Sequence, residues 1–350
     1  MGEPRPAIAE IQTPMLRIHF TDADLARTSV AAGADPMWEL VLSLHRLQNR
    51  RGRTLVDRWY SSARERLASS GLTPDVKNRL IPIAPQSMYF PDFLTPDEGR
   101  HGFEAAVEAI EGLPRKELDA QLGIVATMGD GLGAWARSLA DGDRRARKEL
   151  AESLRDYQRV ALEPFWNDLH ADVDADRVRR SRDVLNGGVH GLLHGFEPLM
   201  RWEPPVLSVT YPGGEDIDLH LRGRGLRLIP SYFCWKYPVA LADPELPPVL
   251  VYPMHNGVYR TRKENLLTSG EERVLGNLLG ATRAAALTAV ADGVTTNELA
   301  ARLHISPAAA SHHTRVLREA GLIVSTRDRN HVLHTLTTAG AELLGAGRRA

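Results

Sequence analysis

The chain has 350 residues, 43% of them hydrophobic, and a formal net charge of −1 at neutral pH. This length and apolar content exclude a disordered protein and predict two or three folded domains. The balanced charge excludes a generally basic protein, so any binding of nucleic acid must be local.

Cysteine usage and hydropathy exclude further classes. Cys234 is the single cysteine, which excludes an internal disulfide and indicates a reducing compartment. No stretch approaches the roughly 18 apolar residues of a membrane span, and residues 1–14 lack the charged start and apolar run of a signal peptide. We therefore expect a cytoplasmic protein that does not bind membranes, with residues 1–14 as a flexible arm.

The next residues predict a strand and several helices. "MLRIHF", from Met15, reads as a strand. "DPMWELVLSLHRLQN" predicts a helix that Asp35 caps, with Pro36 at its first position. Further amphipathic stretches predict helices within 54–70, 95–114 and 141–185. The second of these opens with Thr95 and Glu98 at the spacing of a capping box.

From Pro205 the pattern changes to short strand-like runs, "VLSVTY", "DIDLHL", "LRLIPSYFCW" and "PVLVYP", separated by turn residues. These runs predict a small antiparallel sheet. We interpret residues 15–260 as one helical, small-sheet domain for effector binding and dimerisation. Aromatic side chains gather in its sheet region. This pattern is compatible with a rigid apolar pocket for a small organic effector and also with an ordinary core. The candidate ligand-binding residues are Trp202, Tyr232, Trp235 and Tyr252.

Signals for a metal or an active site are weak in this large domain. His190, His194 and Glu197 have a metal-like spacing, but four glycines between residues 187 and 195 weaken the helix that would align them. A bend is the favoured interpretation. "GDGLG" at 129–133 lacks a preceding strand, and neither a G-x-S-x-G nor a phosphate-binding loop motif occurs. We predict no metal, no cofactor and no enzymatic activity.

A change in core composition predicts a second domain. All six Trp, eight Tyr and seven Phe precede residue 270. Residues 261–270, "TRKENLLTSG", predict a linker, and residues 271–347 predict a separate unit.

The local signals of this unit predict a helix-turn-helix. A helical pattern over 271–293 stops at a glycine. Thr295 and Glu298 then form a capping box that opens a short helix. After a tight turn, Ser306 can cap a second short helix with Pro307 at its first position. This helix is halted by Gly321.

The pattern also predicts which residues of this unit meet DNA. In the second short helix, Ala310, Thr314 and Leu317 lie at the spacing of a core face, which turns the remaining side chains outward. "LIVSTR" and "HVLHTLT" alternate around "RDRN" and predict a hairpin, or wing, with arginines at its tip. The candidate DNA-binding residues are Ser306, Ala308, Ala309, Ser311, His312, Arg315, Arg327 and Arg329.

Residues 271–347 resemble the winged helix-turn-helix of ArsR-type bacterial transcription regulators. The resemblance rests on "ELAARL", "SHH", "VLREAGL" and the closing "LT..G". It implies a sequence-specific regulator that binds an inverted repeat in double-stranded DNA as a homodimer. The sequence departs from the family at Thr314, where such regulators usually carry an apolar residue. The alternative is an enzyme or scaffold protein that uses the winged helix for protein contact.

The metal ligands usual in that family are missing here. "NELAARL" has no Cys, and "TTAGAELLGAGRRA" has no His, so we predict no metal in this domain. The pairs His312/His313 and His331/His334 fall on the predicted DNA face and wing. There we expect them to contact phosphate or solvent.

Overall fold

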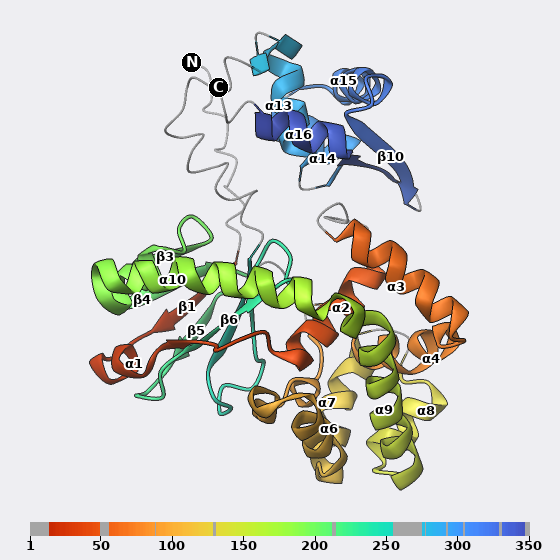
Figure 1. Cartoon of the computed structure of the whole chain (residues 1–350), viewed down its shortest axis with the longest axis vertical. Helices are drawn as coiled ribbons and strands as arrows, with labels where there is room; N and C mark the ends of the chain where they lie inside the picture. Colours follow the sequence, from red (N-terminus) through yellow and green to blue (C-terminus); the bar gives the residue numbers. More distant parts are fainter. Residues whose placement is uncertain are drawn as a thin grey trace, which may run out of the picture.

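The computed structural model describes residues 14–49, 56–87, 89–128, 131–211, 215–254, 275–276, 278–291, 293–303, 305–328 and 331–346. The arm predicted over 1–14 lies outside these ranges except for Pro14, and the predicted linker, 261–270, lies outside them completely. The described chain is mostly helical with small sheets, and a helix-turn-helix unit lies at its carboxy-terminal end (Figure 1). This confirms the predicted α+β, mostly helical fold class.

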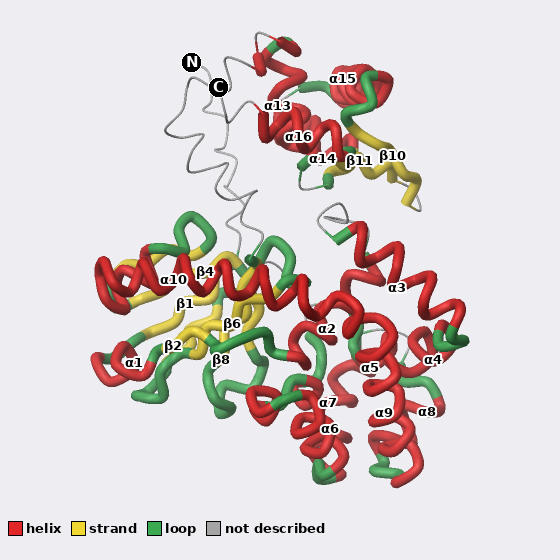
Figure 2. Tube along the Cα trace, viewed as in Figure 1, coloured by secondary structure: helices red, strands yellow, loops and turns green. Residues whose placement is uncertain are grey.

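In the amino-terminal part most helices gather on one side, and the strands lie on the other with the first and the longest helix beside them (Figure 2). The longer helices are α1 (Asp22–Arg27), α2 (Pro36–Gln48), α3 (Asp57–Ser69), α6 (Phe103–Glu111), α7 (Arg115–Thr127), α8 (Ala134–Ala140), α9 (Arg144–Tyr157) and α10 (Trp166–His194). Shorter helical segments are α4 (Thr73–Asp75), η2 (Val76–Leu80), α5 (Ile81–Ile83), η3 (Asp92–Leu94), η4 (Asp97–His101), η5 (Gln158–Leu162) and η6 (Glu163–Phe165). None of the helices in the described ranges is long and apolar enough to span a bilayer.

Helix α2 lies at the centre of the helical core. The predicted cap is confirmed, because Oδ1 of Asp35 accepts the backbone N–H of Met37 at 3.2 Å and that of Trp38 at 3.4 Å. Most side chains of α2 are buried, including those on the face opposite its main apolar stripe. The helix is therefore enclosed by other elements on nearly every side.

A buried carboxylate ties α2 to the strands. Glu39, fully buried in α2, accepts hydrogen bonds from the Ser231 hydroxyl at 2.9 Å and from the N–H groups of Tyr232 at 2.8 Å and Phe233 at 3.2 Å. Burial raises the pKa of Glu39 to about 7. The helical and strand regions are thus joined by directed polar contacts as well as by apolar packing.

The helix predicted from Thr95 begins later than expected. Residues 97–101 form a 3₁₀ turn, and α6 starts at Phe103 after Gly102, whose φ is 119°. The Thr95 hydroxyl donates to the carbonyl of Asp92 at 3.3 Å. The predicted capping box was therefore wrong, because a glycine in a conformation that few other residues adopt separates these residues from the helix.

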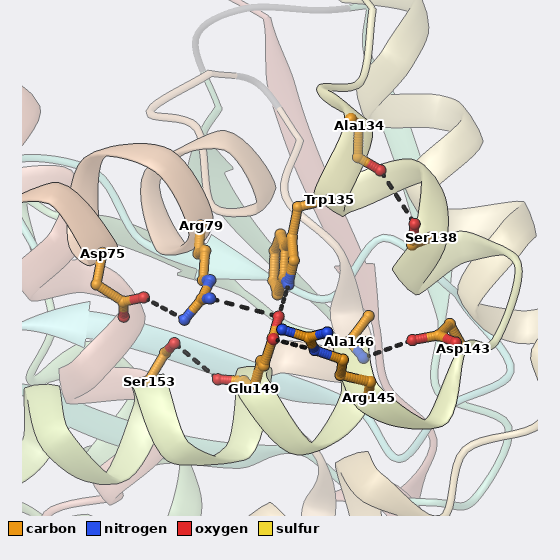
Figure 3. A network of polar contacts seen from close by, with 10 residues as sticks. All are labelled: Asp75, Arg79, Ala134, Trp135, Ser138, Asp143, Arg145, Ala146, Glu149 and Ser153. Carbon is orange, nitrogen blue, oxygen red and sulfur yellow. Dashed lines mark hydrogen bonds and ion pairs between the residues drawn. The ribbon is translucent and has the colours of Figure 1, made fainter.

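Glu149 joins three helical segments through one carboxylate (Figure 3). It accepts hydrogen bonds from Nε of Arg145 at 2.9 Å and from Nε1 of Trp135 at 3.0 Å, and it lies 3.3 Å from the guanidinium of Arg79. The bond from Arg145 and the charge of Arg79 hold the pKa of Glu149 below its usual range. Arg79 also donates to Asp75 at 2.6 Å. This network fixes the ends of α8 and α9 against η2.

Helix α10 bends where the sequence predicts it. Gly187 and Gly188 have non-helical backbone angles, with φ of −155° and 59°. The segment after the bend packs against β3 (Met200–Glu203). The predicted glycine bend is confirmed, and it places His190 and His194 on a segment of different direction from the rest of α10.

The strands form two mixed sheets instead of the one small antiparallel sheet that we expected. The first has the order β3-β4-β1-β5 and the second the order β2-β6-β8-β7. Their strands are β1 (Met15–His19), β2 (Ser29–Val30), β4 (Val206–Thr210), β5 (Ile217–His220), β6 (Arg227–Ser231), β7 (Val239–Ala240) and β8 (Val249–Pro253), in addition to β3. The predicted strand at Met15 is confirmed, but it lies between β4 and β5 and pairs in parallel with β5.

The parallel pairings account for this correction. β6 pairs in parallel with β2 and with β8, and all five residues of β8 are buried. A strand covered on both faces shows a continuous apolar run, which gives no indication of the direction of its neighbours. Pairing between distant segments therefore could not be inferred from the alternation of residues.

The carboxy-terminal unit has its own core. One cluster of buried apolar residues, from Ala286 to Leu336, belongs to it alone. Its elements are α13 (Ala281–Val290), β9 (Val294–Thr295), α14 (Thr296–Leu303), α15 (Pro307–Glu319), β10 (Ile323–Asp328), β11 (His331–Leu336) and α16 (Thr338–Ala346). The strands form a sheet of order β10-β11-β9. The helical pattern predicted over 271–293 is interrupted at Gly280, whose φ is 86°.

Candidate nucleic-acid interface

The two helices of the helix-turn-helix each begin at a local cap, α14 at Thr295 and α15 at Ser306. N–H of Thr295 donates to Oε2 of Glu298 at 2.9 Å, and N–H of Glu298 donates to Oγ1 of Thr295 at 3.3 Å. Oγ of Ser306 accepts the N–H of Ala309 at 3.2 Å, with Pro307 at the first helical position. Both predicted caps are confirmed: the Thr295 box sets the start of α14, and Ser306 sets the start of α15 after the turn.

Helix α15 has the two faces that its sequence predicts. Ala310, Thr314 and Leu317 are buried. The predicted DNA-contact residues of this helix and its cap lie on the other side: Ser306, Ala308, Ser311, His312 and Arg315 are exposed, and Ala309 is half-buried. A packed inner face and a free outer face with small side chains near its amino end leave the helix available to a groove.

Thr314 is accommodated in the core without an unmet polar group. It is 2% exposed, and its hydroxyl donates to the carbonyl of Ser311 at 3.1 Å, within the same helix. Its methyl group is left for the apolar interior. The departure from the apolar residue of the family therefore leaves the packing of α15 intact.

Arg315 is an accessible cation on the outer face of α15. Its side chain is 58% exposed, and its Nε lies 3.8 Å from Oε1 of Glu319, whose side chain is 65% exposed. An ion pair this long and this solvated contributes little free energy. Arg315 can therefore exchange this partner for another acceptor at small cost.

The wing has the predicted hairpin form. β10 and β11 pair antiparallel from Ile323 opposite Leu336 to Asp328 opposite His331. Arg327 lies in β10 opposite Val332, near the tip. Arg329 lies outside the described residues. The backbone thus brings the Arg327 position to the end of the wing, as the sequence predicts.

The expectation that His334 contacts phosphate or solvent was wrong. His334 is 2% exposed, and its ring nitrogens lie 2.9 Å from Oγ1 of Thr296 and 2.8 Å from Oγ of Ser325. This side chain lies on the face of β11 that α14 covers, and not on the outer surface of the wing. Burial, with the charge of Arg318, lowers the pKa of His334.

The histidine pair of α15 divides between surface and interior. His312 is exposed, and its ring centre lies 5.6 Å from that of half-buried His313. Burial, followed by the nearby charges of His312 and Arg283, lowers the pKa of His313. Of these two, His312 is therefore the one that offers an accessible ring to a nucleic acid.

The metal-like spacing after the α10 bend does not form a cluster. Nδ1 of His190 accepts the indole N–H of Trp202 at 3.1 Å, and Nδ1 of His194 lies 3.5 Å from Glu197. Across the described part of the chain, no three His, Cys, Asp or Glu side chains are grouped to hold a metal ion.

The four candidate ligand-binding aromatics occupy different environments. Trp202 and Tyr252 are buried in the core between α10 and the sheets, where the Tyr252 hydroxyl donates to Asp176 at 2.7 Å. Tyr232 is half-buried and packs against the helical core. Trp235 lines a cavity of about 600 Å³.

Sequence reasoning missed most of that cavity. Its wall includes His45 and Arg46 from α2 and Phe90 from the loop after α5, none of which was a candidate. His45 and Arg46 are more than 40 positions from Phe90 along the chain, and no motif connects any of the three to Trp235. The folded topology alone brings them together.

Comparison with known proteins locates one domain. Residues 278–326 match the family model of a helix-turn-helix domain. The matched range runs from before α13 to within β10 and contains the whole of α14 and α15. No curated protein and no solved structure matches the chain. The carboxy-terminal unit is therefore a helix-turn-helix domain, as the sequence predicts.

Proposed function

We propose that the protein is a sequence-specific transcription regulator of the bacterial ArsR type. It acts in the cytoplasm, binds double-stranded DNA as a homodimer, and responds to a small organic effector held by its amino-terminal domain. The observation that carries the proposal is the outer face of α15, where Ala308, Ser311 and Arg315 are exposed over a fully packed inner face.

This face has the properties that reading of a major groove requires. The groove of B-DNA is about 12 Å wide and admits an α-helix. Small side chains at Ala308 and Ser311 let the helix backbone approach base edges and phosphates. Arg315 can donate two parallel hydrogen bonds to the O6 and N7 atoms of guanine. Ser311 and His312 can reach a base or a phosphate.

The wing supplies contacts of a second kind. Arg327 lies near the hairpin tip, and the sequence predicts Arg329 beside it. Both would meet phosphates, which position the domain without reading sequence. Because one short helix and one wing cover only a half-site, two copies are needed for specific affinity. A twofold dimer predicts an inverted repeat in the operator.

A second candidate function is protein contact by the winged helix of an enzyme or scaffold. It is favoured by two exposed apolar side chains of the wing, Val324 at 45% and Val332 at 42%. Under this alternative the domain would bind DNA only weakly and without sequence preference.

The proposal is tested by DNase I footprinting of the purified full chain on the DNA upstream of its own gene. We expect protection of two inverted half-sites whose centres are about 10 bp, or a multiple of it, apart. Inserting about 5 bp between them should abolish joint protection, since it rotates one half-site by half a turn. Protection of one asymmetric site by a monomer would contradict the dimer, and uniform weak binding would favour the protein-contact alternative.

A further inference from the structure

The cavity beside α2 has the size and enclosure of a small-molecule site. Its volume is about 600 Å³, within the 300–1,000 Å³ of typical ligand pockets. Its wall combines α2, residues on both sides of position 88 (Gln86, Ser87, Tyr89 and Phe90), strand β5 and the segment from Phe233 to Pro244. It therefore lies where the helical region meets both sheets, a position that ligand sites often occupy.

Aromatic rings make up much of the wall. Phe90, Trp235 and Tyr237 line it from two distant segments, together with Tyr89 and Tyr211. Phe90 is held by edge contacts with Trp38, at 5.8 Å between ring centres, and with His45, at 5.4 Å. Rings fixed in this way present flat apolar surface at little cost in side-chain entropy, which suits a ligand that itself contains rings.

Two polar groups of α2 face this apolar wall. Nε2 of His45 is buried and has no hydrogen-bond partner among the described residues. Burial, with the charge of Arg46, lowers the pKa of His45 to about 4, so the ring is neutral near pH 7. Arg46 is 4% exposed, and its guanidinium carbon lies 5.0 Å from the centre of the Trp235 ring. A buried nitrogen without a partner costs free energy that a ligand can recover.

The acids of the wall are engaged elsewhere. The carboxylate of Asp92 accepts the N–H groups of Ala242 at 3.0 Å and Asp243 at 2.8 Å. That of Asp218 pairs with Arg17 at 2.9 Å and with His19 at 2.7 Å. Arg46 is the cation among the described lining residues, so an anionic ligand group is favoured over a cationic one.

We propose that this cavity binds an aromatic organic anion, with its rings against Phe90 and Trp235 and its anionic group at Arg46 and His45. The ligand is the effector of the regulator described above, so its regulatory role rests on that proposed function, while its binding does not.

A strand connects the cavity to the chain that leads to the DNA-binding domain. Val239 and Ala240 of β7 line the cavity and pair with Val251 and Leu250 of β8. β8 ends at Pro253, and the next helix-turn-helix residues described begin at Leu275. A ligand that prefers one position of β7 would act on the strand from which the chain leaves the amino-terminal part.

The test uses two fluorescent probes that differ by one charged group, 1-anilinonaphthalene-8-sulfonate and neutral N-phenyl-1-naphthylamine. Each is titrated into the full chain without DNA. We expect saturable binding of both probes, with the sulfonate bound more tightly. In Arg46→Met, which keeps an unbranched side chain over Trp235, the preference for the sulfonate should fall about tenfold, the equivalent of about 1.4 kcal/mol. The affinity of the neutral probe should change little.

A matched pair of substitutions shows whether the probes occupy the cavity. Leu219→Trp adds a ring at a half-buried lining position of edge strand β5. Leu185→Trp makes the same change at an 85% exposed position of α10 outside the lining. Leu219→Trp should weaken both probes at least about tenfold, whereas Leu185→Trp should not. Far-UV circular dichroism of each variant verifies its fold.

Three results would overturn the proposal: absence of saturable binding, equal binding by Leu219→Trp and the wild-type chain, or an unchanged sulfonate preference in Arg46→Met. Because DNA is absent from these titrations, a negative result leaves the footprinting test of DNA binding unaffected. Conversely, probe binding by a chain that protects no DNA would contradict the proposed function and would still support the ligand site.

Discussion

Oγ1 of Thr296 and Nε2 of His334 lie 2.9 Å apart inside the helix-turn-helix domain, where they join α14 to β11. Ser325 holds the other ring nitrogen at 2.8 Å. The imidazole thus connects the first helix of the motif to both long strands of the wing. This side chain therefore helps to set the orientation of the wing relative to the helices.

We predict that the domain loses stability in mild acid because of His334. Burial lowers the pKa of His334 in the folded domain, whereas an unfolded histidine titrates near about 6.5. As the pH falls below that value, the unfolded chain takes up a proton that the folded domain excludes, so the free energy of unfolding decreases. His334→Gln should be less stable at pH 8 and should lose part of this pH dependence.

The readout of this prediction must report on the carboxy-terminal domain alone. No Trp or Tyr follows residue 270, so intrinsic fluorescence does not detect its unfolding. The unfolding is detected by amide hydrogen exchange of peptides from α14 and β11, measured between pH 5 and 8. His312→Gln changes an exposed ring of α15 and serves as the control. Equal pH dependence in wild type and His334→Gln would contradict the prediction.

Gly340 should tolerate no side chain. A Cβ at this position would lie 2.0 Å from the carbonyl oxygen of Leu322 and 3.2 Å from a methyl group of Leu336. This close approach of α16 to the start of the wing gives a physical reason for the glycine in the "LT..G" pattern. We expect Gly340→Ala to lower the free energy of unfolding of the domain by about 2 kcal/mol or more.

A second helical glycine provides the control. A Cβ at Gly123 in α7 would meet no atom within 4 Å, so Gly123→Ala should stabilise the amino-terminal part by about 0.5–1 kcal/mol. Amide hydrogen exchange of peptides from α16 and from α7, measured along a denaturant series, gives each change separately. If the two substitutions had effects of the same sign, the contact between Gly340 and Leu322 would not be the determining factor.

Local signals of the sequence were sufficient for the DNA-binding domain but not for the rest. The caps at Thr295 and Ser306 are set by residues within three positions, and each is found where it was predicted. The capping box at Thr95 failed because Gly102 separates Thr95 and Glu98 from the start of α6. Even in the well-predicted domain, the burial of His334 depended on the packing of α14 against β11, which no local signal indicates.

The candidate ligand site depended on longer-range information. Trp235 and Arg46 meet only because α2 packs beside the segment after β6. The cavity wall also contains tryptophan and tyrosine, but Trp202 and Tyr252 lie in the core near α10. Aromatic composition therefore identified the region and could not distinguish a pocket from a core, since that difference arises from pairings between distant strands.

Glu39 should make the stability of the amino-terminal part decrease as the pH rises. Burial raises the pKa of this carboxyl from 4.5 to about 7. Between these values the folded protein binds more protons than the unfolded chain, so the free energy of unfolding falls with increasing pH. Glu39→Gln removes this titration. The stability advantage of the wild type over Glu39→Gln should therefore shrink from pH 4.5 to 7.5.

Tryptophan fluorescence is suited to this measurement because Trp38 and Trp59 lie in the same core as α2. Urea denaturation at several pH values gives the difference between the two proteins. Subtracting the variant cancels the titration of groups common to both, such as His45. A stability difference that grew with pH would show that the hydrogen bonds from Tyr232 and Phe233 outweigh the cost of burying the charge.

The last prediction concerns how Arg315 and the wing divide their roles in DNA binding. Arg315 is 58% exposed on the outer face of α15, where a base edge is within reach. Arg315→Ala should cost about 1–3 kcal/mol on the preferred operator and relax the preference at one base pair. Arg329→Ala, at the predicted wing tip, should weaken binding to all sequences alike and lower the salt slope by about 1.

Fluorescence anisotropy with a set of single-base operator variants at several salt concentrations separates these effects. Glu319→Gln is the control, because it removes the acid 3.8 Å from Arg315 without changing the arginine. It adds one net positive charge and should bind at least as well as the wild type. If Arg315→Ala instead weakened every operator variant equally, its guanidinium would contact a phosphate, and the base reading of α15 would have to come from Ser311 and His312.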